Sequence, residues 1–419
     1  MLFNWNPNRL FYGWWIVGAC LLTNLYTGGV IFFGFTAVFE PIASEFGWSY
    51  TQISLAASLR GLEMGILAPV IGMLVDRWGP RKLMFGGAFI SGIGLILLSR
   101  ITSLGMFYGA FVLIAIGMST CTSTVTITAV ANWFRRKISI ATGIMVSGFA
   151  LGGLVVPLIA VLIDSLGWRT AMVSLGFGMW AICVPLSLIV RHKPEQYGYL
   201  PDGEASTAIN AGENMKSTAS HEKETGARQA LSSRIFWLIA LGAMYQAFAV
   251  NAVVTHVMPY LSSIGIGRSV SSLMASATPL ASVLGRIGFG WLGDRHDKRW
   301  VAAIGFALMA LGLIIFGIIP TVGTWLLVPF ALIFGTGWGG VVPMVEGGLI
   351  REYFGRSHFG TILGFVFGVM MIGVIIGAPL AGWAYDEWGS YQGIWFVYAG
   401  CGAAALVAML TIPPLDKTT

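Results

Sequence analysis

This 419-residue sequence has few charged residues: they make up 10% of it, whereas hydrophobic residues make up 56%. Soluble domains carry about 25% charged residues, so this chain has too few to cover a surface that faces water. A soluble fold is therefore excluded, and we expect a lipid bilayer to be its main solvent. The net charge of +6 does not indicate nucleic-acid binding, because the basic residues sit in short clusters between apolar runs.

Cysteine is also rare. The four cysteines, Cys20, Cys121, Cys183 and Cys401, lie inside apolar runs and show neither a CxxC pattern nor metal-ligand spacing. We interpret them as buried apolar residues and expect no metal or other cofactor. No nucleotide-binding loop, HExxH helix or catalytic-triad signal occurs, so the sequence does not indicate an enzyme. The sequence also contains no N-x-S/T acceptor, which favours a bacterial source.

Long apolar runs dominate the chain, and each has the ~17–25 residues that cross ~30 Å of hydrocarbon. Their approximate ranges are 11–35, 50–75, 83–99, 104–132, 138–163 and 169–190, followed by 235–261, 269–293, 300–319, 323–350, 357–385 and 391–412. The polar stretch between the two sets has almost no large apolar residue, which is typical of a solvated linker. We therefore predict an N-terminal six-helix bundle (1–190), a cytoplasmic linker (191–233) and a C-terminal six-helix bundle (234–419).

The distribution of lysine and arginine predicts the orientation. If the N-terminus is cytoplasmic, nineteen of the 24 basic residues fall inside, and only Arg100, Arg169 and Arg268 fall outside. The remaining two, Arg60 and Arg286, lie within spans. Cytoplasmic loops carry the excess of positive charge in membrane proteins. We therefore expect a multi-pass protein of the cell membrane, a bacterial inner membrane, with both termini cytoplasmic.

The two sets of spans resemble each other. Residues 71–77 (IGMLVDR) end the second span, and residues 289–295 (FGWLGDR) end the eighth. A second match pairs Pro157, Asp164 and Gly167 with Pro379, Asp386 and Gly389. Matches at one offset of 218 to 222 residues indicate a duplicated six-helix unit. The predicted fold is an all-α integral membrane protein with twelve transmembrane helices in two pseudo-symmetric bundles, an architecture typical of alternating access.

The loop after the second span carries the most specific motif. Residues 72–82, GMLVDRWGPRK, resemble the loop motif of the major facilitator superfamily between spans two and three. The glycine at its start permits close helix contact, and its aspartate can pair with basic residues or a helix N-terminus. We expect the motif and its repeat to form a gate at the cytoplasmic face. The residues assigned to it are Gly72, Asp76, Arg77, Arg81, Asp294 and Arg295.

Two further motifs resemble the monocarboxylate and oxalate–formate transporter branch of that superfamily. They are residues 11–17 (FYGWWIV) and residues 132–137 (NWFRRK), the latter followed by Ala141 and Gly143. The resemblance implies transport of a small carboxylate, with a proton or in exchange for another carboxylate. The sequence departs from animal monocarboxylate carriers, which have an aspartate where this chain has Ser282. It also has no lysine in span eleven, where oxalate–formate exchangers have one.

Arg286 is the sharpest candidate for a binding residue. It lies eight residues before Asp294, ~12 Å along the helix from the inner end and near mid-membrane. A guanidinium at that depth is costly, is usually functional and can bind a carboxylate through two hydrogen bonds. An interhelical ion pair is the alternative. No acidic residue lies within one helical turn of Arg286. Its neighbours Pro279, Ala281, Ser282, Gly285 and Gly288 are small or compact, and we expect them to leave room beside the helix for a ligand.

Other polar residues fall at middle depths of the spans. Candidate ligand contacts are Asn24, Tyr26, Tyr245, Gln246, Asn251 and Ser282. Arg60 and Glu63, three residues apart in span two, form either a structural pair or a proton-coupling pair, with Glu63 as the proton carrier. Glu346 is expected to pair with a base on the cytoplasmic side, and proton carriage by its carboxyl group is the alternative.

The sequence thus predicts a secondary active transporter of small organic anions that acts as a monomer. Its substrate would be a monocarboxylate such as lactate or pyruvate, or a small dicarboxylate, with a proton as the coupling ion. A carboxylate exchanger, a carrier of a drug or sugar, and a transporter-like membrane sensor are the alternatives.

Overall fold

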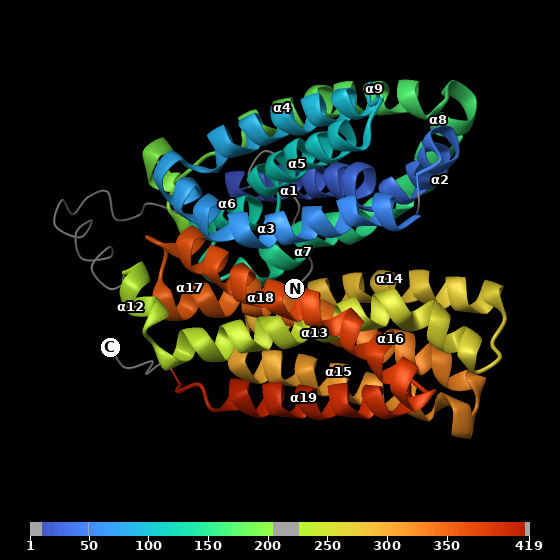
Figure 1. The fold of residues 1–419 in the computed structure, drawn as a ribbon. Coiled ribbons are helices and arrows are strands. Elements are labelled where there is room, and N and C mark those ends of the chain that lie inside the picture. The colour runs from blue at the N-terminus through green and yellow to red at the C-terminus, as the bar shows by residue number, and fades with distance from the viewer. Residues whose placement is uncertain (1–10, 49, 204–225, 415–419) are drawn as a thin grey trace.

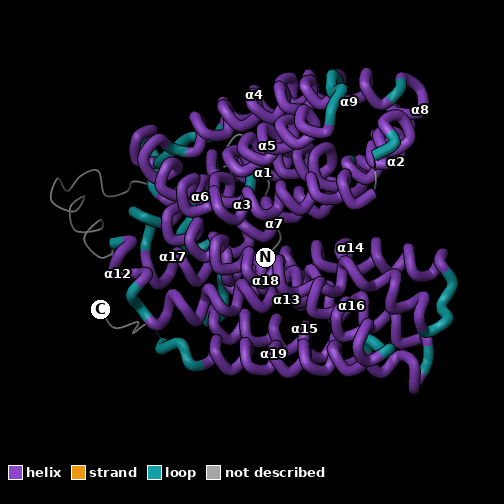
Figure 2. The backbone as a smooth tube through the Cα atoms, viewed as in Figure 1, coloured by secondary structure: helices purple, strands orange, loops and turns teal. Residues whose placement is uncertain are grey.

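The computed structural model describes residues 11–48, 50–203 and 226–414, and these are helical almost throughout, with no strand among them. Figure 1 shows two helical bundles lying one above the other, and Figure 2 shows that short loops join their helices. The ribbons of the bundles are adjacent at the end near α12 and α17 and diverge toward the opposite end. We call the adjacent end the linker end, because residues 191–203 and α12 lie there.

The N-terminal bundle (α1 to α10) follows the first six predicted spans closely. Several spans consist of consecutive helical segments, in which η marks a 3-10 or π segment. They are α1 (Tyr12–Thr27), η2 (Gly28–Phe33) and α2 (Phe35–Phe46); α3 (Tyr50–Trp78); α4 (Pro80–Leu98); α5 (Leu104–Cys121) and α6 (Ser123–Trp133); α7 (Ile138–Leu151), η3 (Gly152–Val155) and α8 (Val156–Leu166); and α9 (Trp168–Gly178), η4 (Met179–Cys183) and α10 (Val184–Ile189).

The C-terminal bundle (α13 to α19) contains the other six spans. Two short 3-10 segments, η5 (Pro194–Tyr197) and η6 (Pro201–Gly203), and the short helix α12 (Ala227–Leu231) precede it. Its elements are α13 (Arg234–Ser263), α14 (Arg268–Gly293), α15 (Lys298–Val322), η7 (Thr324–Leu326), α16 (Leu327–Pro343), η8 (Met344–Gly348), α17 (Leu349–Phe354), α18 (Phe359–Trp388) and α19 (Gln392–Leu410).

Length and hydropathy fit a chain that spans a membrane. In the described part of the chain, ten helices or runs of segments are long and apolar enough to cross a bilayer. The other two long helices, α3 and α14, have 29 and 26 residues, enough for about 39 Å or more at 1.5 Å per residue. They carry Arg60, Glu63 and Arg286, the charged side chains that the sequence places deepest in the spans. The structure thus accounts for the twelve predicted spans.

Large apolar side chains face outward on many helices; Leu158, Ile66 and Trp325 are each at least 65% exposed. Such a surface requires lipid, because a water-soluble protein rarely exposes large contiguous apolar patches. Three of the cysteines are buried as predicted, whereas Cys401 is exposed. The prediction was wrong there because an apolar run facing lipid reads the same in sequence as one facing protein.

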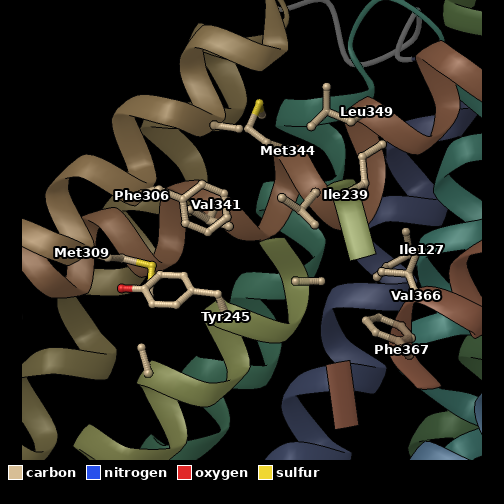
Figure 3. Close-up of a cluster of buried hydrophobic side chains, with 14 of the residues drawn as sticks. Ile127, Ile239, Tyr245, Phe306, Met309, Val341, Met344, Leu349, Val366 and Phe367 are labelled. Atoms are coloured by element: carbon tan, nitrogen blue, oxygen red, sulfur yellow. The ribbon is translucent and has the colours of Figure 1, made fainter. Parts of the chain in front are cut away.

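The buried apolar side chains form two clusters: the larger contains residues of both bundles, and the smaller lies within the N-terminal bundle. Figure 3 shows part of the larger one, with Ile127 of α6 close to Val366 and Phe367 of α18. In the same view the ring of Tyr245 of α13 lies near that of Phe306 of α15, and their centroids are 5.8 Å apart. The packing therefore joins the bundles as well as filling each one.

Candidate functional site

Asp76 joins the two bundles at the linker end. It lies near the end of α3, and its carboxylate accepts hydrogen bonds from the backbone N–H groups of Gly360 (3.0 Å) and Thr361 (2.7 Å) and from the Thr361 hydroxyl (2.7 Å). Both residues belong to the first turn of α18, where the N–H groups have no partner within the helix. The negative charge also complements the positive end of the helix dipole.

Asp294 makes the corresponding contact from the other bundle. Directly after α14, its carboxylate accepts from the N–H groups of Ser139 (2.8 Å) and Ile140 (2.9 Å), in the first turn of α7. Burial raises the pKa of Asp294, whereas these hydrogen bonds lower it. We refer to the Asp76 and Asp294 contacts together as the aspartate contacts. They are related by the same internal repeat that the sequence shows.

Glycines allow the helices to approach closely beside each aspartate. A Cβ atom on Gly72 would lie 2.2 Å from the Gly360 carbonyl oxygen, and one on Gly290 would lie 2.7 Å from that of Ser139. The backbones of α3 and α18, and of α14 and α7, could not meet in this way with larger residues there. The predicted gate residues Gly72, Asp76 and Asp294 therefore all lie at contacts between the two bundles.

The basic residues assigned to the gate lie differently. Arg77 and Arg81 are exposed. The Arg295 guanidinium lies 3.9 Å from the ring centroid of Trp291, in the last turn of the helix that precedes it. Two arginines that sequence reasoning treated only as positive charge make contacts between the bundles instead. Arg351 and Arg356 donate to the carbonyl oxygens of Ala131 (3.3 Å) and Asn132 (3.2 Å), at the C-terminal end of α6.

The start of the linker adds to these contacts. Glu195 pairs with Arg356 at 2.7 Å. Asp202 accepts from the N–H groups of Arg135, Arg136 and Lys137, just before α7. No motif marked Glu195 or Asp202, because the polar composition of the linker hides individual contacts.

Arg286 is buried, with 6% of its surface exposed, and lies where α14 meets α7 of the other bundle. Its Nη1 donates to the Val146 carbonyl oxygen at 2.6 Å, and its guanidinium carbon lies 5.7 Å from the Trp338 ring centroid. Its Nε has no partner among the described residues. Arg286 makes no direct ion pair with a described residue, and its electrostatic partner is Glu346. The guanidinium therefore retains donor capacity for an anion.

Asn24 reaches the same turn of α7. Its Nδ2 lies 3.4 Å from the carbonyl oxygen and 2.9 Å from the sulfur of Met145, the residue before Val146. Its Oδ1 is buried and has no partner among the described residues. The structure therefore brings Asn24 and Arg286 to adjacent carbonyl groups of α7, one from each bundle.

The other candidate ligand residues make contacts within a single bundle. The Tyr26 hydroxyl donates to Leu175 O (2.9 Å), Asn251 Nδ2 donates to Val374 O (2.7 Å) and the Ser282 hydroxyl donates to Pro279 O (2.6 Å). The Tyr245 hydroxyl and Gln246 Oε1 are buried without a described partner. Among the described residues, none of these side chains is hydrogen-bonded to Arg286.

The small residues around Arg286 have a packing role in the structure. A Cβ on Gly285 would lie 2.1 Å from Thr336 O, and one on Gly339 would lie 1.9 Å from Ser282 O, so these residues bring α14 against α16. The expectation that they leave room for a ligand was wrong at these positions. The side chains of Arg60 and Glu63 lie outside the described part of the chain.

The comparisons with known proteins agree with the fold. The model of the Major Facilitator Superfamily matches residues 15–345 and 256–419. Monocarboxylate transporter 12 of Mus musculus is 25% identical over 96% of this chain and 85% of its own length. Monocarboxylate transporter 13 of Bos taurus is also 25% identical, over 96% of this chain and 89% of its own.

Solved structures resemble the whole chain. The proton:xylose symporter XylE, bound to 6-bromo-6-deoxy-D-glucose, has a TM-score of 0.78 at 16% identity, covering 98% of this chain and 97% of that one. A single-residue variant of the E. coli fucose:proton symporter FucP has a TM-score of 0.70 at 15% identity, covering 96% and 98%. With the family match extending over nearly the entire chain, this protein belongs to the Major Facilitator Superfamily.

Proposed function

We propose that this protein is a secondary active transporter of small organic anions, with monocarboxylates such as lactate or pyruvate, or a small dicarboxylate, as substrates. The observation that carries the proposal is Arg286, a buried guanidinium between the bundles with an unpartnered Nε and no direct ion pair to a described residue. A carboxylate matches such a planar donor group with two oxygens. The similarity to monocarboxylate transporters supports the same substrate class.

Transport would occur by alternating access with proton symport. The aspartate contacts hold the linker end together, and their loss would let the two bundles separate there. We further propose that the linker end is cytoplasmic, that both termini lie on that side, and that the protein works as a monomer in a bacterial inner membrane. The positive-inside distribution of lysine and arginine supports this orientation.

The test is uptake of radiolabelled lactate, pyruvate and small dicarboxylates into proteoliposomes, with and without an inward proton gradient. Arg286→Ala should abolish uptake and Arg286→Lys should weaken binding, because a hydrogen bond to a charged group is worth about 1.5–3 kcal/mol, roughly 10- to 150-fold in affinity. Arg100→Ala, at an exposed position in a loop, is the matched control and should behave as wild type.

Wild-type affinity in a monodisperse Arg286→Ala protein would show that this arginine is structural. Uptake that depends on a second carboxylate inside rather than on the proton gradient would indicate an exchanger. Uptake of a sugar or drug but of no carboxylate would refute the substrate class. Binding without flux would indicate a sensor.

A further inference from the structure

Glu346 is a buried carboxyl group that the contacts described so far do not use. It lies in η8, the π segment between α16 and α17, and 7% of its surface is exposed. π segments within helices are frequent at functional sites. The expectation that Glu346 pairs with a base on the linker side was wrong: it makes no direct ion pair or hydrogen bond with a described residue. Lys298, whose Cδ would lie 2.7 Å from a Cβ on Gly348 of η8, pairs with Glu352 at 2.8 Å.

The helices packed around η8 are α6, α7, α13, α14, α15, α16 and α17. Of these, α6, α7 and α16 carry no ionisable residue. The ionisable residues of the others are Arg234, Tyr245, His256 and Tyr260 on α13, Arg268 and Arg286 on α14, Lys298 and Arg299 on α15, and Arg351, Glu352 and Tyr353 on α17. Asp294 follows α14. Within this set, Arg286 and Glu346 act on each other electrostatically.

The segment that carries Glu346 touches the other bundle. A Cβ on the next residue, Gly347, would lie 2.9 Å from Thr142 Oγ1 of α7. That hydroxyl is buried and has no hydrogen-bond partner among the described residues. Arg286 donates to Val146, one turn further along α7. The segment that carries Glu346 and the Arg286 side chain therefore contact successive turns of the same helix, α7, at Thr142 and Val146.

We propose that Glu346 carries the proton that is coupled to carboxylate binding at Arg286. This inference rests on the proposed function. A buried guanidinium needs a compensating negative charge, and a second uncompensated charge nearby is costly. In the empty protein, ionised Glu346 balances Arg286. When a substrate carboxylate binds Arg286, it supplies that negative charge, and Glu346 takes up a proton. Each state then has the same net charge, and one proton accompanies each monocarboxylate.

The first measurement is proton uptake by purified protein on addition of L-lactate or pyruvate, followed with a pH-indicator dye in weakly buffered solution. Wild type should take up about one proton for each carboxylate bound, and Glu346→Gln should bind the carboxylate with no uptake. Glu352→Gln is the matched control, since this surface carboxylate should leave uptake unchanged. Glu346→Met, apolar and of similar length, serves as a second variant in case Glu346→Gln is not monodisperse.

The second measurement is transport in proteoliposomes. Glu346→Gln should lose accumulation driven by an inward proton gradient but keep exchange of internal for external pyruvate. Three outcomes would each overturn the inference and leave carboxylate transport standing. Glu346→Gln could take up as many protons as wild type, or proton uptake could be lost in Glu63→Gln instead. In the third outcome, wild type binds the carboxylate without taking up a proton. Failure of wild type to bind L-lactate, pyruvate or any small dicarboxylate would refute the proposed function as well, so the two failures are distinguishable.

Discussion

The aspartate contacts give the clearest prediction about movement. Asp76 accepts three hydrogen bonds from the first turn of α18, and Asp294 accepts two from that of α7. Replacing either with asparagine removes the charge and leaves one acceptor oxygen. Hydrogen bonds to charged groups are worth about 1.5–3 kcal/mol. Burial of these carboxylates offsets part of that gain, so we take the lower end, about 1.5 kcal/mol for each aspartate.

A change of about 1.5 kcal/mol is roughly tenfold in an equilibrium constant. We therefore expect Asp76→Asn and Asp294→Asn each to shift the ratio of closed to open linker ends about tenfold toward the open form. The two contacts share no residue, so the double variant should shift it about a hundredfold. Transport should slow in each case, while substrate affinity should change little.

The assay is a distance measurement between spin labels on Lys82→Cys and Trp300→Cys, at exposed positions near the linker ends of α4 and α15 in opposite bundles. Cys401, the exposed native cysteine, is first replaced by serine. Asp297→Asn is the matched control, because Asp297 contacts Arg299 within its own bundle. Unchanged distance distributions in both single variants and the double variant would refute the reasoning.

Two further predictions concern packing and orientation. Gly143→Ala should favour the open linker end and slow transport, because the new Cβ would lie 2.1 Å from the Arg286 carbonyl oxygen. Gly86→Ala is the control, because a Cβ there would meet open space. Equal transport rates in the two variants would contradict this packing. Lys216→Cys should resist labelling by an impermeant thiol reagent in intact cells, because the predicted linker is cytoplasmic, and labelling there would reverse the orientation.

Span positions could be predicted from sequence to within a few residues. The run predicted at 269–293 is α14 at Arg268–Gly293, and the run at 300–319 is α15 at Lys298–Val322. Hydropathy succeeds here because bilayer thickness fixes the length of each span. The internal repeat also identified Asp76 and Asp294 as equivalent residues, and the structure gives them equivalent helix partners.

The direction of polar side chains could not be predicted in the same way. The rise per residue gives the depth of Tyr26 or Asn251 in the membrane, but not the side of the helix on which it lies. In a soluble helix, the polar face indicates that side; here both lipid-facing and buried faces are apolar, so the signal is weak. Tyr26 and Asn251 consequently bond to helices of their own bundles. Glu346 was misjudged because no sequence rule located the π segment that carries it.

The two halves of the repeat share their backbone arrangement but differ in the side chains at equivalent positions. Ala68 and Arg286 are 218 residues apart, the offset of the two aspartates. A Cβ on Gly364 would lie 2.3 Å from the Ala68 carbonyl oxygen, just as one on Gly143 would lie 2.1 Å from that of Arg286. The two crossings are therefore equivalent in the main chain, which suits a rocking motion about the axis that relates them. The arginine, in contrast, occurs in one crossing only. In the proposed mechanism, charge-dependent binding is therefore confined to the contact of α14 with α7, and the contact of α3 with α18 repeats its packing without its charge.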